Sequence, residues 1–165
     1  MTQCDAPVPI DLDDGILVAH LLALNNAHAA ELSLLDAARF RHLVGEAFYA
    51  CRIGASDAFM LSFDETADYD SPNFLWFRDR YPRFAYVDRI CVSPVARGRG
   101  LARRLYDALF ARARRAGHEV IVCEVNIAPP NPGSDAFHAA LGFTEVGSAA
   151  IHHGAKTVRY LARSL

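Results

Sequence analysis

The sequence has few cysteines, no long apolar run and no large excess of either charge. Its four cysteines lie far apart among 165 residues, without the CxxC spacing that zinc sites and redox motifs use. We therefore expect neither a zinc site nor a disulfide framework, and this cysteine usage favours a reducing cytoplasm. The cysteines are Cys4, Cys51, Cys91 and Cys123.

No segment has the features of a signal peptide or a membrane span. Residues 1–14 carry several aspartates and lack both a basic start and an apolar stretch. The most apolar segment, Gly15 to Leu24, contains His20 and falls far short of the roughly 20 apolar residues that a bilayer requires. The sequence thus predicts no membrane partner.

The charges nearly cancel, because 17 lysines and arginines face 19 aspartates and glutamates. No whole-molecule field then attracts nucleic acid, and we expect no nucleic-acid partner. The basic run Arg112 to Arg115 lies at the carboxyl end of a predicted helix, where arginines favour the helix dipole. His152 and His153 lack a third ligand at a recognisable spacing, so we expect no metal site.

Apolar residues make up 52% of the chain and charged residues 22%, which suffices for a continuous buried core. The length suits one domain, and we find no internal repeat and no linker rich in glycine, serine or proline. The prediction is a single domain over residues 1–165.

The first half of the chain predicts helices followed by a hairpin. Apolar residues recur with helical spacing from Asp11 to about Ala30, and Asp36 can cap a second helix that reaches Val44. Two apolar strands follow, at 48–53 and 58–63. Residues 64–83 mix acidic and aromatic side chains without a clear period, and we interpret them as an ordered functional loop.

In the second half of the chain the predicted strands and helices alternate more regularly. A strand, a helix and a second strand in succession suggest a right-handed parallel crossover. Glycines stop both predicted helices, and a proline-rich link at 126–133 separates the second strand from the second helix. A mixed α/β sheet flanked by helices is therefore expected. The predicted elements are strands at 84–92, 120–125, 143–148 and 157–161, and helices at 101–116 and 134–141.

The strongest local signal lies between the predicted strand at 84–92 and the helix that follows. Its letters, Arg97-Gly98-Arg99-Gly100-Leu101-Ala102, place two glycines where backbone N–H groups can converge on phosphate oxygens at the positive end of a helix. Arg97, Arg99 and Arg103 add positive charge. A tight turn with solvated arginines is the alternative, but the flanking strand and helix favour an anion cradle.

Two common nucleotide motifs do not fit this loop. A dinucleotide fingerprint requires a further glycine at the position of Arg103. A nucleoside-triphosphate loop ends in Gly-Lys-Ser/Thr, whereas here Gly100 precedes Leu101 and Ala102.

The same letters match the motif Gln/Arg-x-x-Gly-x-Gly/Ala, and the chain resembles the GCN5-related N-acetyltransferases, the GNAT superfamily. The resemblance runs from about Tyr86 to Phe143 and includes Cys123-Glu124-Val125 on a predicted strand. It implies a mixed, mostly antiparallel sheet in which a central parallel strand pair is splayed around acetyl-CoA.

In that family the motif grips the pyrophosphate of acetyl-CoA, and the preceding strand pairs its backbone with the pantetheine arm. Ile90 and Val92 can also be core residues, because only their backbone is needed. Asn131 stands seven residues before His138, where the family often places an asparagine that contacts CoA. The resemblance therefore implies these cofactor-binding residues: Ile90, Cys91, Val92, Arg97, Gly98, Arg99, Gly100, Leu101, Ala102, Arg103 and Asn131.

Glu124 is the most informative carboxylate, since alternation puts it with Val120, Val122 and Asn126 on one side of an apolar strand. The resemblance implies that it is the general base, which takes a proton from the incoming ammonium, usually through water. Partial burial raises the pKa of a carboxyl group and suits it to that task. A structural ion pair with Arg89 is the alternative.

His138 departs from the family pattern, because many members have tyrosine at this place in Tyr-x-x-x-Gly-Phe. That tyrosine protonates, or hydrogen-bonds, the departing CoA thiolate. An imidazolium can do the same, so the resemblance implies a catalytic acid at His138. A hydrogen-bonded structural histidine is the alternative.

Asp88, Tyr69 and Trp76 are the candidates for binding the acceptor, with Asp68, Asp70 and Asn73 also in the acidic, aromatic segment. Asp88 can receive a cationic amine, or it can form an ion pair with Arg89 or Arg83.

Together these residues predict an acetyl-CoA-dependent N-acetyltransferase that acts on the primary amine of a small molecule by direct attack in a ternary complex. Two alternatives stay open. One is acetylation of protein or peptide amino termini, which the Glu124 pattern also suggests, and the other is a non-catalytic acyl-CoA sensor. A homodimer is expected from the family resemblance.

Overall fold

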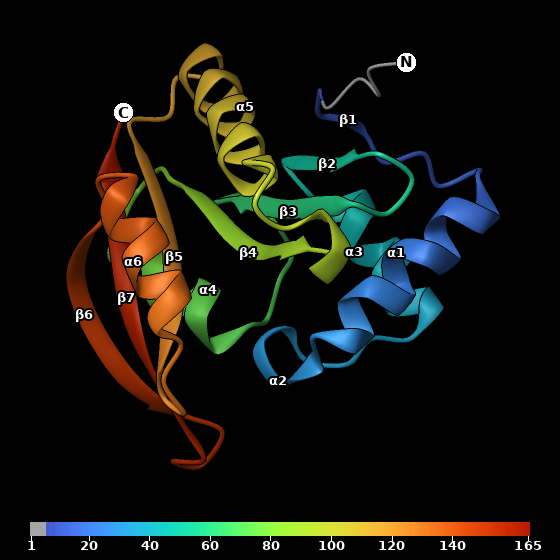
Figure 1. Cartoon of the computed structure of the whole chain (residues 1–165). Coiled ribbons are helices and arrows are strands. Elements are labelled where there is room, and N and C mark those ends of the chain that lie inside the picture. Colours follow the sequence, from blue (N-terminus) through green and yellow to red (C-terminus); the bar gives the residue numbers. More distant parts are fainter. Residues whose placement is uncertain (1–5) are drawn as a thin grey trace.

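The computed structural model describes residues 6–165, which form a seven-stranded sheet with helices on both faces (Figure 1). The strand order is β1-β2-β3-β4-β5-β7-β6. Every neighbouring pair is antiparallel except β4 and β5, which are parallel. The predicted fold class, a mostly antiparallel mixed sheet with one central parallel pair, is confirmed.

The strands are β1 (Val8–Pro9), β2 (Tyr49–Ile53), β3 (Ala58–Asp64), β4 (Ala85–Val92), β5 (Val120–Ala128), β6 (Thr144–Ile151) and β7 (Lys156–Ser164). The helices are α1 (Gly15–Ala27), α2 (Ala29–Leu32), α3 (Ala37–Glu46), α4 (Pro72–Arg78), α5 (Leu101–Arg115) and α6 (Pro132–Ala140), with a short 3-10 turn η1 (Pro94–Ala96).

Side-chain caps and glycines set several helix ends, as the sequence indicated. The Asp36 carboxylate accepts a hydrogen bond from the backbone N–H of Arg39 at 2.7 Å and so begins α3. Gly117 has a φ of 81° just beyond α5, a left-handed conformation that glycine adopts without steric cost. The predicted helix from Asp11 to Ala30 is shorter and divided, because Asp14 caps α1 and α2 begins anew at Ala29.

The interpretation of residues 64–83 as a loop was wrong in part, because α4 lies within it. Ser71 precedes Pro72, and proline at the first helical position fits the fixed φ that a helix start needs. Phe74 and Phe77 then lie three residues apart on the buried side of α4. A helix of two turns is too short to show a clear hydrophobic period, so the sequence of α4 does not distinguish it from a loop.

The final hairpin is longer than predicted, since β6 extends to Ile151 and β7 to Ser164. β6 is the edge strand of the sheet and is mostly exposed, so its alternation of apolar and polar residues is weak. β5 also continues to Ala128, and part of the predicted proline-rich link is therefore strand.

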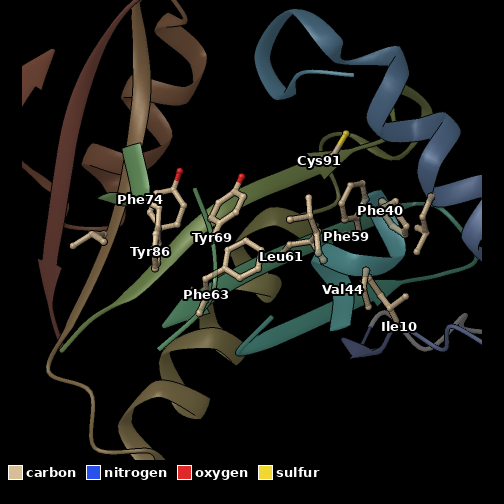
Figure 2. Close-up of a cluster of buried hydrophobic side chains, with 14 of the residues drawn as sticks. Ile10, Phe40, Val44, Phe59, Leu61, Phe63, Tyr69, Phe74, Tyr86 and Cys91 are labelled. Atoms are coloured by element: carbon tan, nitrogen blue, oxygen red, sulfur yellow. The ribbon is translucent and has the colours of Figure 1, made fainter. Parts of the chain in front are cut away.

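Two apolar clusters lie on opposite faces of the sheet. One packs α1, α3 and α4 against it and contains Phe59, Tyr69 and Tyr86. Figure 2 shows the hydroxyl groups of Tyr69 and Tyr86 pointing the same way at one end of this cluster. The other cluster packs α5 against the opposite face, with Leu105 and Tyr106 fully buried.

A bulge in β4 opens the sheet at its centre. Leu61 of β3 pairs with Arg89 and the next residue, Ser62, pairs with Val87, so Asp88 is the extra residue. β4 and β5 pair through Ala85 and Tyr86 and then run apart (Figure 1). The predicted splay of the parallel pair is therefore present.

Three of the four cysteines lie among the described residues. Cys51, Cys91 and Cys123 are free and buried, while Cys4 lies outside the described residues. Within residues 6–165 the helices fall short of the length and apolar character that a bilayer span requires.

Close contact between α4 and β6 makes Gly147 sensitive to any side chain. A Cβ at Gly147 would lie 2.5 Å from the indole ring of Trp76. We expect Gly147→Ala to lower the free energy of unfolding by about 1–3 kcal/mol through overpacking. Gly45→Ala in α3, where a Cβ meets nothing within 4 Å, should instead raise it by about 0.5–1 kcal/mol. Urea denaturation measures both, and equal effects would contradict the contact.

Candidate active site

A cleft follows the opening between β4 and β5. It consists of three hollows of about 520, 100 and 300 Å³, and Glu31 and Leu32 at the end of α2 line all of them. We call the largest the outer hollow, the smallest the middle hollow and the third the inner hollow. Glu124 and Asp88 line both the middle and the inner hollow, so they stand where the two meet.

The outer hollow collects many of the sequence-predicted cofactor residues. It lies along the carboxyl half of β4 and the amino-terminal parts of α5 and α6. Its chemistry is mixed, with apolar walls and the Arg97 guanidinium. The predicted residues that line it are Ile90, Cys91, Val92, Arg97, Ala102 and Asn131.

The loop before α5 has the conformation of an anion cradle. Gly98 and Gly100 have φ angles of 77° and 74°, which side chains other than glycine rarely adopt. Gly100 is the N-cap of α5, and in the part of the chain that the structure describes no side chain caps this helix end. The first N–H groups of a 15-residue helix therefore keep their donors for an anion, which fits a diphosphate.

The arginines of this loop divide between the hollow and the surface. Arg97 lines the outer hollow and donates to Nε2 of His28 at 3.3 Å. Arg99 and Arg103 turn to other partners, because they form ion pairs with Asp57 at 3.0 Å and Asp107 at 3.4 Å.

Two other predicted cofactor residues also have structural roles. Leu101 is 2% exposed and belongs to the core beneath α5, so its backbone alone is available to a ligand. The Asn131 side chain caps α6 by accepting a hydrogen bond from the backbone N–H of Ser134 at 3.3 Å.

One oxygen of Glu124 is held and the other has no partner. Oε1 accepts hydrogen bonds from the Asn73 amide and from the Tyr86 hydroxyl, both at 3.0 Å. The Tyr160 hydroxyl donates to Oδ1 of Asn73 at 2.9 Å and so fixes which way that amide faces. Oε2 is buried and finds no hydrogen-bond partner among residues 6–165. The alternative ion pair of Glu124 with Arg89 is absent from the described residues.

Burial raises the pKa of Glu124 to about 8, and the nearby charge of Asp88 adds to this shift. The hydrogen bonds from Tyr86 and Asn73 act in the opposite direction, because they stabilise the carboxylate. A carboxyl group with this pKa exchanges protons near neutral pH, where an ordinary glutamate stays ionised.

Asp88 forms the ion pair that was one of its two predicted roles. Its Oδ2 accepts from Nε of Arg89 at 3.0 Å, and the two side chains are 6% and 7% exposed. The Tyr69 hydroxyl donates to Oδ1 at 2.8 Å. Arg89 also donates to Oδ1 of Asn25 at 2.9 Å, which ties β4 to α1. Because Arg89 already compensates its charge, Asp88 contributes less to binding a cation than a free carboxylate would.

Both ring nitrogens of His138 make hydrogen bonds. Its Nδ1 lies 2.8 Å from the carbonyl oxygen of Ser134, which can only accept, so the proton sits on Nδ1. Its Nε2 lies 2.7 Å from the Tyr106 hydroxyl and accepts from it. Burial lowers the pKa of His138, which favours the neutral ring. These contacts favour the alternative of a hydrogen-bonded structural histidine, and a catalytic acid at His138 stays a prediction.

Trp76 is not among the described residues that line the three hollows. Its indole ring stacks on Tyr160 with ring centroids 4.1 Å apart, and the Arg80 guanidinium lies 4.0 Å from its centroid. This packing explains Trp76 without a ligand. Tyr69 and Asp88, in contrast, both line the inner hollow.

Several residues of the cleft carried no signal in the sequence. Glu31 belongs to the four-residue α2, and Tyr106 has the spacing of an ordinary core residue of α5. Lys156 begins β7 after a turn. Asn73 was among the candidates for binding the acceptor. Its hydrogen bond to Glu124 could not be predicted, because the two residues lie 51 positions apart in the chain.

A comparison with family models and one with curated proteins both match part of the chain. The model of the acetyltransferase (GNAT) family matches residues 69–143, which include β4, the glycine loop, α5, β5 and α6. L-2,4-diaminobutyric acid acetyltransferase from Wolinella succinogenes is 31% identical over 67 residues, which are 41% of this chain. The match spans 39% of that relative's length.

Solved structures resemble the whole chain. Ribosomal-protein-alanine N-acetyltransferase from Brucella melitensis has a TM-score of 0.71 at 18% identity over 96% of this chain and 99% of its own. Polyamine N-acetyltransferase from Drosophila melanogaster has a TM-score of 0.70 at 15% identity over 97% and 99%. An aminoglycoside 6'-N-acetyltransferase complexed with coenzyme A scores 0.71 at 12% identity over 96% of both chains. At these identities the likeness shows a shared fold.

The hydrogen bond between Tyr106 and His138 is buried, so removing one partner should cost stability. We expect Tyr106→Phe to lower the free energy of unfolding by about 1–2 kcal/mol, because Nε2 of His138 then lacks a donor. Tyr81→Phe is a control on a partly exposed ring, with an expected change below about 0.5 kcal/mol. Urea denaturation decides, and a Tyr106→Phe protein as stable as the control would contradict the bond.

Proposed function

The chain belongs to the GNAT acetyltransferase superfamily, and from that premise we propose that it transfers an acetyl group from acetyl-CoA to the primary amine of a small molecule. One observation carries the proposal. The outer hollow, with the glycine loop and Arg97, continues through the middle hollow to the inner hollow, where Glu124 has an oxygen without a partner.

Acetyl-CoA enters this proposal as a substrate that fits the outer hollow. The uncapped start of α5 and the Arg97 guanidinium supply donors and positive charge for the diphosphate. Beyond Tyr86, one edge of β4 has left β5, and its backbone groups can pair with an extended pantetheine arm as a strand would. An N–H on that edge can also polarise the thioester carbonyl, where negative charge develops during transfer.

Glu124 is assigned the general base. An amine must lose a proton before it attacks, and Oε2 of Glu124 is the free acceptor at the junction of the two hollows. Asn73 and Tyr86 fix the carboxylate through its other oxygen and leave Oε2 to receive the proton, directly or through water. The amine then attacks the carbonyl within the ternary complex, so that positioning supplies much of the rate.

His138 is assigned no proton transfer, because its Nε2 accepts from Tyr106. The CoA thiol leaves as a thiolate, which an ordinary thiol pKa of about 8.5 permits without a dedicated acid. Tyr106 and His138 instead form part of the wall of the middle hollow.

The size of the inner hollow supports a small acceptor. Its volume of about 300 Å³ is at the lower end of the range for small-molecule sites. The relatives point to two classes of acceptor, because they include polyamine and diaminobutyric acid acetyltransferases as well as ribosomal-protein-alanine acetyltransferases. Transfer to a peptide amino terminus stays the alternative. A cytoplasmic location, a homodimer and a single domain over residues 1–165 also stay predictions.

Glu124 should set the pH dependence of turnover. Below a pH of about 8 the carboxyl group holds its own proton and accepts none, so kcat/KM should rise as pH increases through that value. We call this rise of kcat/KM with pH the limb of the pH profile. Glu124→Gln should lower kcat/KM by about 100-fold or more and flatten this limb. Asn73→Ala removes a hydrogen bond that lowers the pKa, so it should move the limb to higher pH.

Two acceptors of different amine pKa provide the control for this measurement. A limb that belongs to Glu124 keeps its position with both, whereas a limb that belongs to the amine moves with the acceptor. A Glu124→Gln enzyme that retains the wild-type limb would remove Glu124 as the base.

Binding of CoA tests the cradle separately from turnover. We expect Arg97→Ala to weaken binding of CoA by about tenfold, because a charge-assisted hydrogen bond to phosphate is lost. Arg103→Ala, whose side chain pairs with Asp107, should change it by no more than about twofold. Calorimetry measures both. A wild-type chain that binds no CoA overturns the proposed function, and binding without turnover favours the acyl-CoA sensor.

A further inference from the structure

Lys156 is the one lysine among the 17 basic residues of the chain, and it lines the inner hollow. Its Nζ donates to the carbonyl oxygen of Ala30 at 3.2 Å. Within residues 6–165 no carboxylate forms an ion pair with it, whereas Arg39 at the same hollow pairs with Asp70 at 3.2 Å. Lys156 therefore brings an uncompensated positive charge to the acceptor side of the cleft.

The sheet holds Lys156 at a fixed place. It pairs with Ile151 on the last rung of the β6 and β7 hairpin, and Ile151 is buried. By alternation Lys156, Val158 and Tyr160 share one face of β7. Tyr160 in turn is the register partner of Glu124 on β5. Lys156 and Glu124 therefore belong to the same face of the sheet.

The spacing of residues along β7 limits the length of a ligand that can lie between Lys156 and Glu124. Lys156 precedes Tyr160 by four residues, which places their Cα atoms about 13 Å apart at a rise of about 3.3 Å per residue. Lys156 and Glu124 both line the inner hollow, whose volume of about 300 Å³ suits a ligand with a short carbon chain.

The other charges of the inner hollow are largely paired. Asp88 is compensated by Arg89, and Asp70 by Arg39. Lys156 at the hairpin remains as a positive charge without an ionic partner among residues 6–165, and the exposed Glu31 lies at the same hollow. Glu124, at the junction with the middle hollow, offers an oxygen without a hydrogen-bond partner in that part of the chain. Such a site suits a molecule that has an amine at one end and a carboxylate at the other.

We propose that the acceptor is a short amino acid whose amine lies at Glu124 and whose carboxylate pairs with Lys156. This assignment rests on the proposed function, because it takes Glu124 as the place of the reacting amine. Lys156 is then the residue that determines specificity for a carboxylate. The lysine ammonium offers three donors to that group at a position that the sheet has already ordered.

Three acceptors that share one four-carbon chain test the assignment: 4-aminobutyrate, n-butylamine and 1,4-diaminobutane. The wild-type protein should show a kcat/KM with 4-aminobutyrate about tenfold or more above either of the others. Lys156→Met should abolish this ratio, and Lys156→Arg, which keeps the charge, should preserve most of it. Arg39→Met is the matched control on the same hollow and should retain the ratio, because Asp70 already neutralises Arg39.

The outcomes separate the two proposals. Equal or better transfer to butylamine or diaminobutane, or a ratio that survives Lys156→Met, overturns the carboxylate assignment and leaves the acetyltransferase proposal intact. Absence of transfer to all three acceptors while CoA is bound overturns the carboxylate assignment, whereas a wild-type chain that binds no CoA overturns the proposed function.

Discussion

The site depends on the short hydrogen-bonded contact between β4 and β5. Two register pairs join these strands, and the bulge at Asp88 then directs β4 away from β5. A fully paired parallel sheet would close this space and bury both strand edges. Because the strands separate, β4 keeps a free backbone edge, and the cleft forms beside residues that the rest of the sheet holds rigid.

The opening between β4 and β5 leaves Glu124 buried beside the core. Its carboxylate loses hydration there, and two hydrogen bonds to one oxygen compensate for part of the lost free energy. The second oxygen remains without a partner, and the pKa rises. A group in this state destabilises the fold whenever it is ionised, so its presence is better explained by chemistry than by stability.

Local signatures predicted a mixed α/β sheet, the glycine loop and a carboxylate on an apolar strand, whereas the family resemblance implied the antiparallel order with one splayed parallel pair. Gly98 and Gly100 stand between a strand and a helix, and Glu124 interrupts an apolar alternation. What could not be predicted depends on contacts between distant segments. The partner of Glu124 is Asn73 on α4, a helix too short to show a period, and the partner of His138 is Tyr106, which has the spacing of a core residue. The residue type alone also did not reveal that burial lowers the pKa of His138 and so favours the neutral ring.

The stacking of Trp76 on Tyr160 has a practical consequence. Trp76 is the single tryptophan of the chain, and the hydroxyl of the tyrosine beneath it holds the amide that positions Glu124. The tryptophan fluorescence of the unlabelled protein therefore originates one ring away from the Asn73 amide that lines the inner hollow. The molecule has its own optical reporter, placed where α4 contacts the last hairpin.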